Sequence, residues 1–272
     1  MDENTIKKAM SGDTQSQSEV LESVSDIVFN LSLRMLGNIE DAKDVSQEIF
    51  IRILDKLSTF RFESAFSTWV YRLSVNVLLR ERKQRSRYQG ISFDVYAMDL
   101  DKANFDVPYE SDLEVKVLAE ELKYSCSNVM LQCLDDRSRC IYVLGTMFHI
   151  DANQGAQIMG ISAVNYRQIL SRTRKKVHEF LDSYCMASGH CDCMRRIGHA
   201  IRTHRLPSDH CDYMALKPIA KERLCHCTEV MENFETQSDL FATLPYYEGK
   251  GVLEDVIQKV KECFQDEQAS HV

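Results

Sequence analysis

The side chains between Phe60 and Arg87 are of the kinds that hold nucleic acids. Three phenylalanines crowd into residues 60–66, Asn76 follows, and five lysines and arginines then surround the single acid Glu81. Aromatic rings stack unpaired bases at roughly 1–3 kcal/mol each, amides read base edges, and cations attract phosphates. Aromatic residues at this density also form protein cores. The cations, however, exceed what a helix end needs, and they favour the nucleic-acid interpretation.

A helix is predicted just before this segment, with one apolar and one acidic face. Apolar residues recur every four positions from Val45 to Leu57, which is typical of a helix side buried in a core. Asn38, with Asp41 three residues later, is a typical helix N-terminus. An acidic helix face is most often merely solvated, so it predicts no partner by itself. The acidic and amide side chains of this face are Asp41, Asp44, Gln47 and Glu48.

Two motifs lie in this stretch: GNIEDAKDVSQEIF at residues 37–50 and FRFESAFSTWVYR at residues 60–72. In this order and at this length they closely resemble region 2 of the bacterial sigma-70 family of RNA polymerase sigma factors, specifically the extracytoplasmic-function (ECF) group. Phe62 stands where that family usually has a glycine.

The resemblance implies two binding surfaces. The acidic face, Asp41 included, would hold the clamp helices of core RNA polymerase. The aromatic turn would form the pocket for a base flipped from the −10 promoter element, with Arg72 and Asn76 beside it. The residues expected to contact the −10 DNA are Phe60, Phe62, Arg72, Asn76, Arg80, Arg82 and Lys83.

A helix-turn-helix is predicted from Asp151 onward. Asp151 and Gln154 have capping-box spacing, and the segment 160–162, Gly-Ile-Ser, makes the turn and caps a second helix. That helix directs Tyr166, Ile169 and Leu170 inward and basic and polar side chains outward. Such a helix fits the major groove of DNA, which is about 12 Å wide.

Residues 134–174 resemble sigma region 4, which reads the −35 promoter element. The resemblance implies DNA contacts for Arg167, Gln168, Ser171 and Arg172, and the outward pattern adds Arg174. Gly155 replaces a usual aliphatic residue, at about 1 kcal/mol of helix propensity. Tyr166 replaces a usual valine.

Composition and spacing predict an all-α protein of two helical domains and a small helical extension. Glycine and proline are scarce, at ten and four of 272 residues, and alternating apolar patterns are few. The segment between the domains is acidic without a clear period, which predicts a mostly unstructured linker. The expected divisions are 1–88 (region 2), 89–112 (linker), 113–184 (region 4), 185–228 (Cys/His-rich segment) and 229–272 (C-terminal helices).

The chain has ten cysteines, and those of region 4, Cys126, Cys133 and Cys140, fit small buried side chains. Two Cys-x-Cys pairs follow, and with nearby histidines they offer ligands for zinc or another thiophilic metal. Redox-active or simply reduced thiols are the open alternatives, and sigma activity itself requires no cofactor. The candidate ligands are Cys185, Cys191, Cys193, Cys211, Cys225 and Cys227.

We therefore expect a non-enzymatic ECF-type sigma factor that binds core RNA polymerase and promoter DNA. An anti-sigma factor is a further candidate partner. The net charge of −8 argues against a protein that coats DNA alone. No apolar run predicts a signal peptide or membrane span, so a cytoplasmic protein is expected. The alternative is a stand-alone helix-turn-helix regulator with a metal- or redox-sensing C-terminal segment, which would have no need of residues 36–87.

Overall fold

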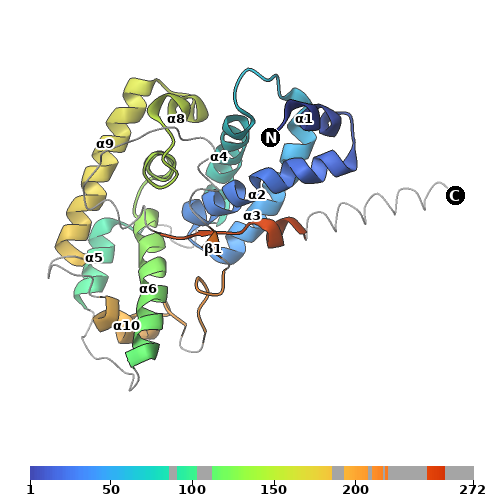
Figure 1. Cartoon of the computed structure of the whole chain (residues 1–272). Helices are drawn as coiled ribbons and strands as arrows, with labels where there is room; N and C mark the ends of the chain where they lie inside the picture. The colour runs from blue at the N-terminus through green and yellow to red at the C-terminus, as the bar shows by residue number, and fades with distance from the viewer. Residues whose placement is uncertain are drawn as a thin grey trace.

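The computed structural model describes residues 1–85, 91–102, 112–185, 193–207, 210–216, 218–219 and 244–254, with backbone alone at 82–85, 112–114 and 219. Within these ranges the structure is helical apart from two short paired strands, which confirms the all-α prediction (Figure 1). The helices are α1 (Glu3–Met10), α2 (Thr14–Leu36), α3 (Ile39–Lys56), α4 (Phe66–Arg85), α5 (Phe93–Asp101), α6 (Asp112–Gln132), α7 (Asp136–Tyr142), α8 (Ala152–Met159), α9 (Ala163–Phe180) and α10 (Cys193–Arg202). Shorter elements are η1 (Leu57–Thr59), η2 (Val143–Met147), η3 (Leu181–Cys185), β1 (Pro218–Ile219) and β2 (Tyr246–Tyr247).

Helices α1–α4 form the first bundle, in which α2 packs against α1, α3 and α4. Gly37 ends α2 in the left-handed conformation, with φ of 70°, a geometry that suits glycine. The side chain of Asn38 then accepts a hydrogen bond from the backbone N–H of Asp41 at 2.9 Å. This confirms the predicted start of α3, whose apolar face is buried at Val45, Ile49 and Ile53.

Helices α7–α9 contain the helix-turn-helix. Asp151 accepts hydrogen bonds from the N–H groups of Asn153 (2.8 Å) and Gln154 (3.1 Å), which caps α8. Gly160 makes the turn with φ of 63°, and Ser162 caps α9. The predicted helix-turn-helix boundaries are therefore confirmed.

The prediction of a mostly unstructured linker is wrong for residues 93–101, which form α5. Its buried side chains recur at intervals of three or four residues and so share one side of the helix: Phe93, Tyr96, Ala97 and Leu100. Two of them pack on Phe180 of α9, with ring centroids 5.0 and 5.6 Å away. The acidic residues between them obscured a period that is amphipathic and helical.

The two bundles pack directly against each other. Helix α4 contacts α8, and the ring of Tyr71 lies 6.0 Å from that of Phe148. The fully buried guanidinium of Arg139 donates to the backbone carbonyl of Met35 at 2.8 Å. It also donates to four acceptors at the end of α6, which satisfies a charge buried between the bundles.

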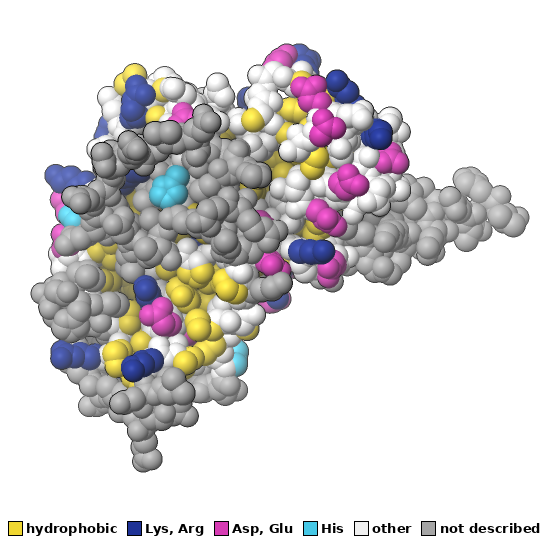
Figure 2. All heavy atoms as spheres, in the orientation of Figure 1, with side chains coloured by type: hydrophobic (Ala, Val, Ile, Leu, Met, Phe, Trp, Pro, Cys, Tyr) yellow, Lys and Arg dark blue, Asp and Glu magenta, His cyan; other side chains and the backbone are white. Residues whose placement is uncertain are grey.

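The C-terminal extension adds α10, which packs against α6, and β2, which lies across α2 (Figure 1). Apolar side chains are visible on the surface over α6 and α10 (Figure 2). Of the C-terminal helices predicted at 229–272, only residues 244–254 are described, and the rest of that range lies outside the described residues. Among the described helices none combines the length and apolar character needed to cross a membrane.

Candidate nucleic-acid and polymerase interface

The predicted polymerase-binding residues share the outer side of α3. Asp44 is exposed, whereas Asp41, Gln47 and Glu48 are half-buried. Between them in sequence, Ala42 and Val45 are fully buried against the core. The helix therefore presents these four side chains together, as its period predicts.

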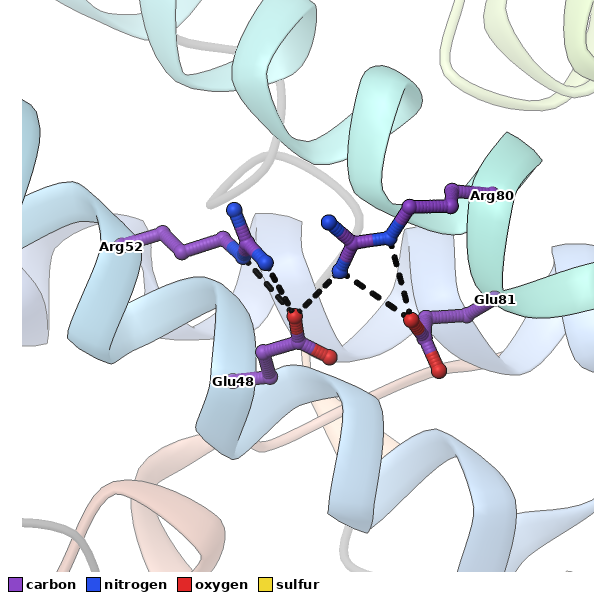
Figure 3. A network of polar contacts seen from close by, with 4 residues as sticks. All are labelled: Glu48, Arg52, Arg80 and Glu81. Atoms are coloured by element: carbon purple, nitrogen blue, oxygen red, sulfur yellow. Dashed lines mark hydrogen bonds and ion pairs between the residues drawn. The ribbon is translucent and has the colours of Figure 1, made fainter.

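Glu48 connects this acidic side of α3 to the basic side of α4 (Figure 3). One of its carboxylate oxygens pairs with Arg52 at 2.8 Å and with Arg80 at 2.6 Å. Arg80 also pairs with Glu81 at 3.1 Å. The hydrogen bonds that Arg80 donates to Glu81 and the nearby charge of Glu48 raise the pKa of Arg80. The sequence analysis predicted Glu48 and Arg80 as separate binding residues, and no pattern in the sequence predicts that their side chains pair.

Helix α4 carries a polar stripe made by Arg72, Asn76 and Arg80. These residues are four apart and exposed, so they project from one side of the helix. An amide flanked by two cations can read a base edge while its neighbours contact phosphates. The side chains of Arg82 and Lys83, expected to extend the stripe, lie outside the described residues.

The aromatic turn differs from its prediction at Phe60. This side chain is 5% exposed, and the rings of Phe62, Phe66 and Trp69 lie 4.7–5.7 Å from it. Phe60 therefore belongs to the core and leaves no ring face for a base. Burial next to aromatic neighbours stabilises the turn more than an exposed ring would.

Phe62 adopts φ of 59°, the left-handed region in which a side chain is strained. This conformation explains why the family that the motif resembles usually has a glycine at this position. Contact with the ring of Phe60 and with the Lys7 ammonium, 5.2 Å away, compensates the strain. Phe62 is half-buried, so it is the more accessible of the two predicted rings.

The exposed side of α9 carries polar and basic side chains. Arg167, Gln168, Ser171 and Arg172 are all exposed on it, whereas Tyr166 is fully buried. The four exposed residues occupy two adjacent helical turns and include amide, hydroxyl and guanidinium donors. Such donors fit both base edges and phosphates in a major groove.

Arg174 does not join that surface, so its outward placement was wrong. Its guanidinium donates to the carbonyl of Gly145 at 2.9 Å and to the hydroxyl of Thr146 at 3.0 Å. Burial lowers the pKa of Arg174. The sequence carried a signal for this, because position 174 continues the four-residue spacing of Tyr166 and Leu170 on the buried side.

The cysteines fall into two groups. Cys133 and Cys140 are buried as predicted, and burial raises the pKa of each thiol to about 12. Cys126 is half-buried. Of the proposed metal ligands, Cys185, Cys193 and Cys211 are described, and the described residues hold no group of three or more potential ligands. The remaining candidates, Cys191, Cys225 and Cys227, lie outside the described residues.

Part of the chain is similar to known sigma factors. Residues 20–88 match the family model described as Sigma-70 region 2. The ECF RNA polymerase sigma factor SigW of Bacillus subtilis is 27% identical over 184 residues, covering 65% of this chain and 94% of SigW. The ECF RNA polymerase sigma-E factor of Escherichia coli K12 is 26% identical over 180 residues, covering 65% of this chain and 92% of that protein. Part of this chain thus accounts for nearly the whole of each relative.

A solved structure has a similar fold. CnrH, determined in complex with the cytosolic domain of CnrY, matches with a TM-score of 0.50 and 20% identity. The match covers 67% of this chain and 97% of CnrH. At this identity the likeness establishes the arrangement of helices.

Proposed function

Because the chain belongs to the ECF group of the sigma-70 family, we propose that it binds core RNA polymerase and directs transcription initiation at promoters with −10 and −35 elements. The observation that supports this best is the exposed stripe Arg72, Asn76 and Arg80 inside the region 2 match. An isolated helix-turn-helix regulator would have no use for a second polar stripe of this kind.

Polymerase binding is assigned to the acidic side of α3. Asp44 is the most exposed of its four residues, and it lies beside the half-buried Gln47 and Glu48. A basic partner surface would be attracted to this side by charge, and the attraction would weaken with salt. Glu48 also pairs with Arg80, so an ion pair joins the polymerase-binding side of α3 to the DNA-facing stripe of α4.

Promoter DNA is assigned to two helices. On α4, Asn76 reads an extruded −10 base and the flanking arginines hold the backbone on either side. On α9, Arg167, Gln168, Ser171 and Arg172 enter the major groove of the −35 element. Neither helix offers enough cations to bind DNA tightly alone at a net charge of −8, so affinity is supplied by the polymerase complex.

Asp44→Lys tests the assignment directly. The substitution reverses an exposed charge without disturbing the core, so the variant should remain helical but lose most of its binding to core polymerase. Glu19→Lys is the matched control, because Glu19 is an exposed acid on α2, outside the proposed surface. The readouts are co-purification with core polymerase and transcription from genomic fragments with and without the protein. Unchanged binding by Asp44→Lys, or no promoter-dependent transcription by the parent, would overturn the proposal.

A protein regulator is a further proposed partner. CnrH was solved in complex with the cytosolic domain of CnrY, so a protein of this fold can bind a domain of another protein. For this chain, such a partner would act by covering the polymerase-binding side of α3 or by holding the bundles together.

A further inference from the structure

Side chains of α2 bind the segment 244–254 by hydrogen bonds to the backbone of that segment. The side-chain amide of Asn30 exchanges two hydrogen bonds with the main chain of Tyr247, at 2.8 and 2.9 Å. Asp26, one turn earlier, accepts the N–H of Gly249 at 2.9 Å. Arg34, one turn later, donates to the carbonyl of Pro245 at 2.7 Å. Side chains from three consecutive turns of α2 thus bind the backbone of one extended segment.

The same segment also holds the second bundle. The hydroxyl of Tyr246 donates to the carbonyl of Met147, and its ring packs 5.7 Å from that of Phe148. These residues immediately precede the helix-turn-helix. Arg34 also donates to Asn128 of α6 at 3.2 Å, so one buried guanidinium contacts α6 and the C-terminal segment together.

An earlier part of the extension spans the same junction. Glu121 of α6, which is 1% exposed, accepts the backbone N–H groups of Tyr213 (2.8 Å) and Met214 (2.9 Å). The hydroxyl of Tyr213 in turn reaches the carbonyl of Gly37, at the end of α2. The extension therefore makes two independent connections between the bundles.

The compact arrangement is incompatible with reading a whole promoter. Positions −10 and −35 lie about 25 base pairs apart, or roughly 85 Å of B-form DNA at ~3.4 Å per pair. Here α4, which carries the −10 stripe, packs directly against α8 of the helix-turn-helix (Figure 1). The bundles must separate before both surfaces can reach their elements together.

We propose that segment 244–254 is an intrachain clamp that binds α2 and η2 together and keeps the sigma factor closed until it is released. The role of this clamp rests on the proposed function, whereas the contacts that form it do not depend on that function. Releasing it exposes Asp26, Asn30 and Arg34 and frees region 4 to move away from region 2.

Gly249→Ala tests the clamp with a single methyl group. A β-carbon there would lie 2.5 Å from the carbonyl carbon of Ser25 and 3.1 Å from the N of Asp26, both in the rigid backbone of α2. The matched control is Gly251→Ala, because no atom lies within 4 Å of a β-carbon at that position. Both glycines lie in the same segment, so differences between the variants report on the contact with α2.

The measurements are small-angle X-ray scattering and affinity for core polymerase, on the full chain. We expect Gly249→Ala to have a larger radius of gyration and about tenfold tighter polymerase binding, as when a closed state that outnumbers the open one is removed. Gly251→Ala should match the parent in both. A synthetic peptide of residues 244–254, added in excess, should return the open variant to the compact dimensions.

Each result separates the clamp from the sigma function. An unchanged radius of gyration in folded Gly249→Ala overturns the clamp, whatever the polymerase result. A larger radius without polymerase binding by any variant supports the clamp and overturns the sigma assignment. If circular dichroism shows that Gly249→Ala is unfolded, Tyr246→Phe takes its place, because it removes only the hydroxyl that reaches Met147. A compact Tyr246→Phe protein that binds polymerase no better than the parent then overturns the clamp.

Discussion

The ring of Tyr166 occupies the space that a side chain at Gly155 would fill. A β-carbon on Gly155 would lie 2.5 Å from the Cε2 and the hydroxyl oxygen of Tyr166. The two residues come from the two helices of the helix-turn-helix, α8 and α9. Gly155 lacks the aliphatic side chain that the family usually has, and Tyr166 is larger than the usual valine. These two departures therefore compensate each other in volume where the two helices cross.

This compensation predicts strong coupling between the two positions. Gly155→Ala should lower the free energy of unfolding by roughly 1–2 kcal/mol, because overpacking outweighs the gain in helix propensity. In a Tyr166→Val background the same change should be neutral or stabilising, since the smaller side chain leaves room. Urea denaturation of both single variants and the double variant gives the coupling energy. Simple additivity of the two effects would contradict the compensation.

Asn76→Ala should impair promoter opening while polymerase binding is retained. Asn76 is exposed on α4, so its loss does not disturb the core, and a lost base-edge contact is worth about 1–3 kcal/mol. Permanganate reactivity of the −10 region measures strand opening, and co-purification with core polymerase is the internal control. Parent-like reactivity would place base recognition elsewhere.

Arg172 and Arg174 are two residues apart and should behave oppositely. Arg172→Ala should weaken −35 DNA binding and reduce the slope of log affinity against log salt by ~0.9, as expected for one lost phosphate contact. Arg174→Ala should instead lower stability, because the carbonyl of Gly145 and the hydroxyl of Thr146 lose their buried donor. Binding isotherms at several salt concentrations and urea denaturation distinguish the two. A stable Arg174→Ala protein with a reduced salt slope would return Arg174 to the DNA surface.

The buried thiol of Cys140 predicts a loss of stability in alkali. Its pKa rises from 9.0 to about 12 in the folded protein. The folded state therefore holds more protons than the unfolded state between these values, and the free energy of unfolding falls as pH rises from 9. The fall is at most about 1.4 kcal/mol per pH unit for one thiol. Urea denaturation at pH 8.5 and 10 should show a shallower decline for Cys140→Ala than for the parent. Identical declines would indicate that Cys140 ionises equally in both states.

The Cys/His-rich segment is predicted to bind about one or two equivalents of zinc or another thiophilic metal. Changing Cys191 and Cys193 to Ser should release the metal and alter promoter activity. Elemental analysis after anaerobic purification measures the metal, and Cys133→Ser is a control because that thiol is buried just after α6, outside the proposed metal-binding segment. Sub-stoichiometric metal in the parent, with normal transcription by the double variant, would leave these cysteines as reduced thiols.

Local chemistry in the sequence determined the elements that carry function. Asn38, Asp151 and Ser162 cap their helices because a side-chain oxygen reaches N–H groups only two or three residues away. Helical period likewise placed Arg172 on an exposed surface, whereas Asn76 was singled out by the resemblance to region 2. Motif length was enough to identify region 2.

Tertiary structure decided what lies far apart in sequence. No local pattern predicts that Asn30 meets Tyr247, 217 residues away, or that Glu48 shares Arg80 with Glu81. Phe60 was misplaced because an aromatic ring suits a surface or an interior. Arg174 was misplaced because a guanidinium is usually exposed, although its spacing from Tyr166 and Leu170 put it on the buried side of the helix. Neighbouring elements decide between these positions by offering a packed cluster in one instance and two buried oxygens in the other.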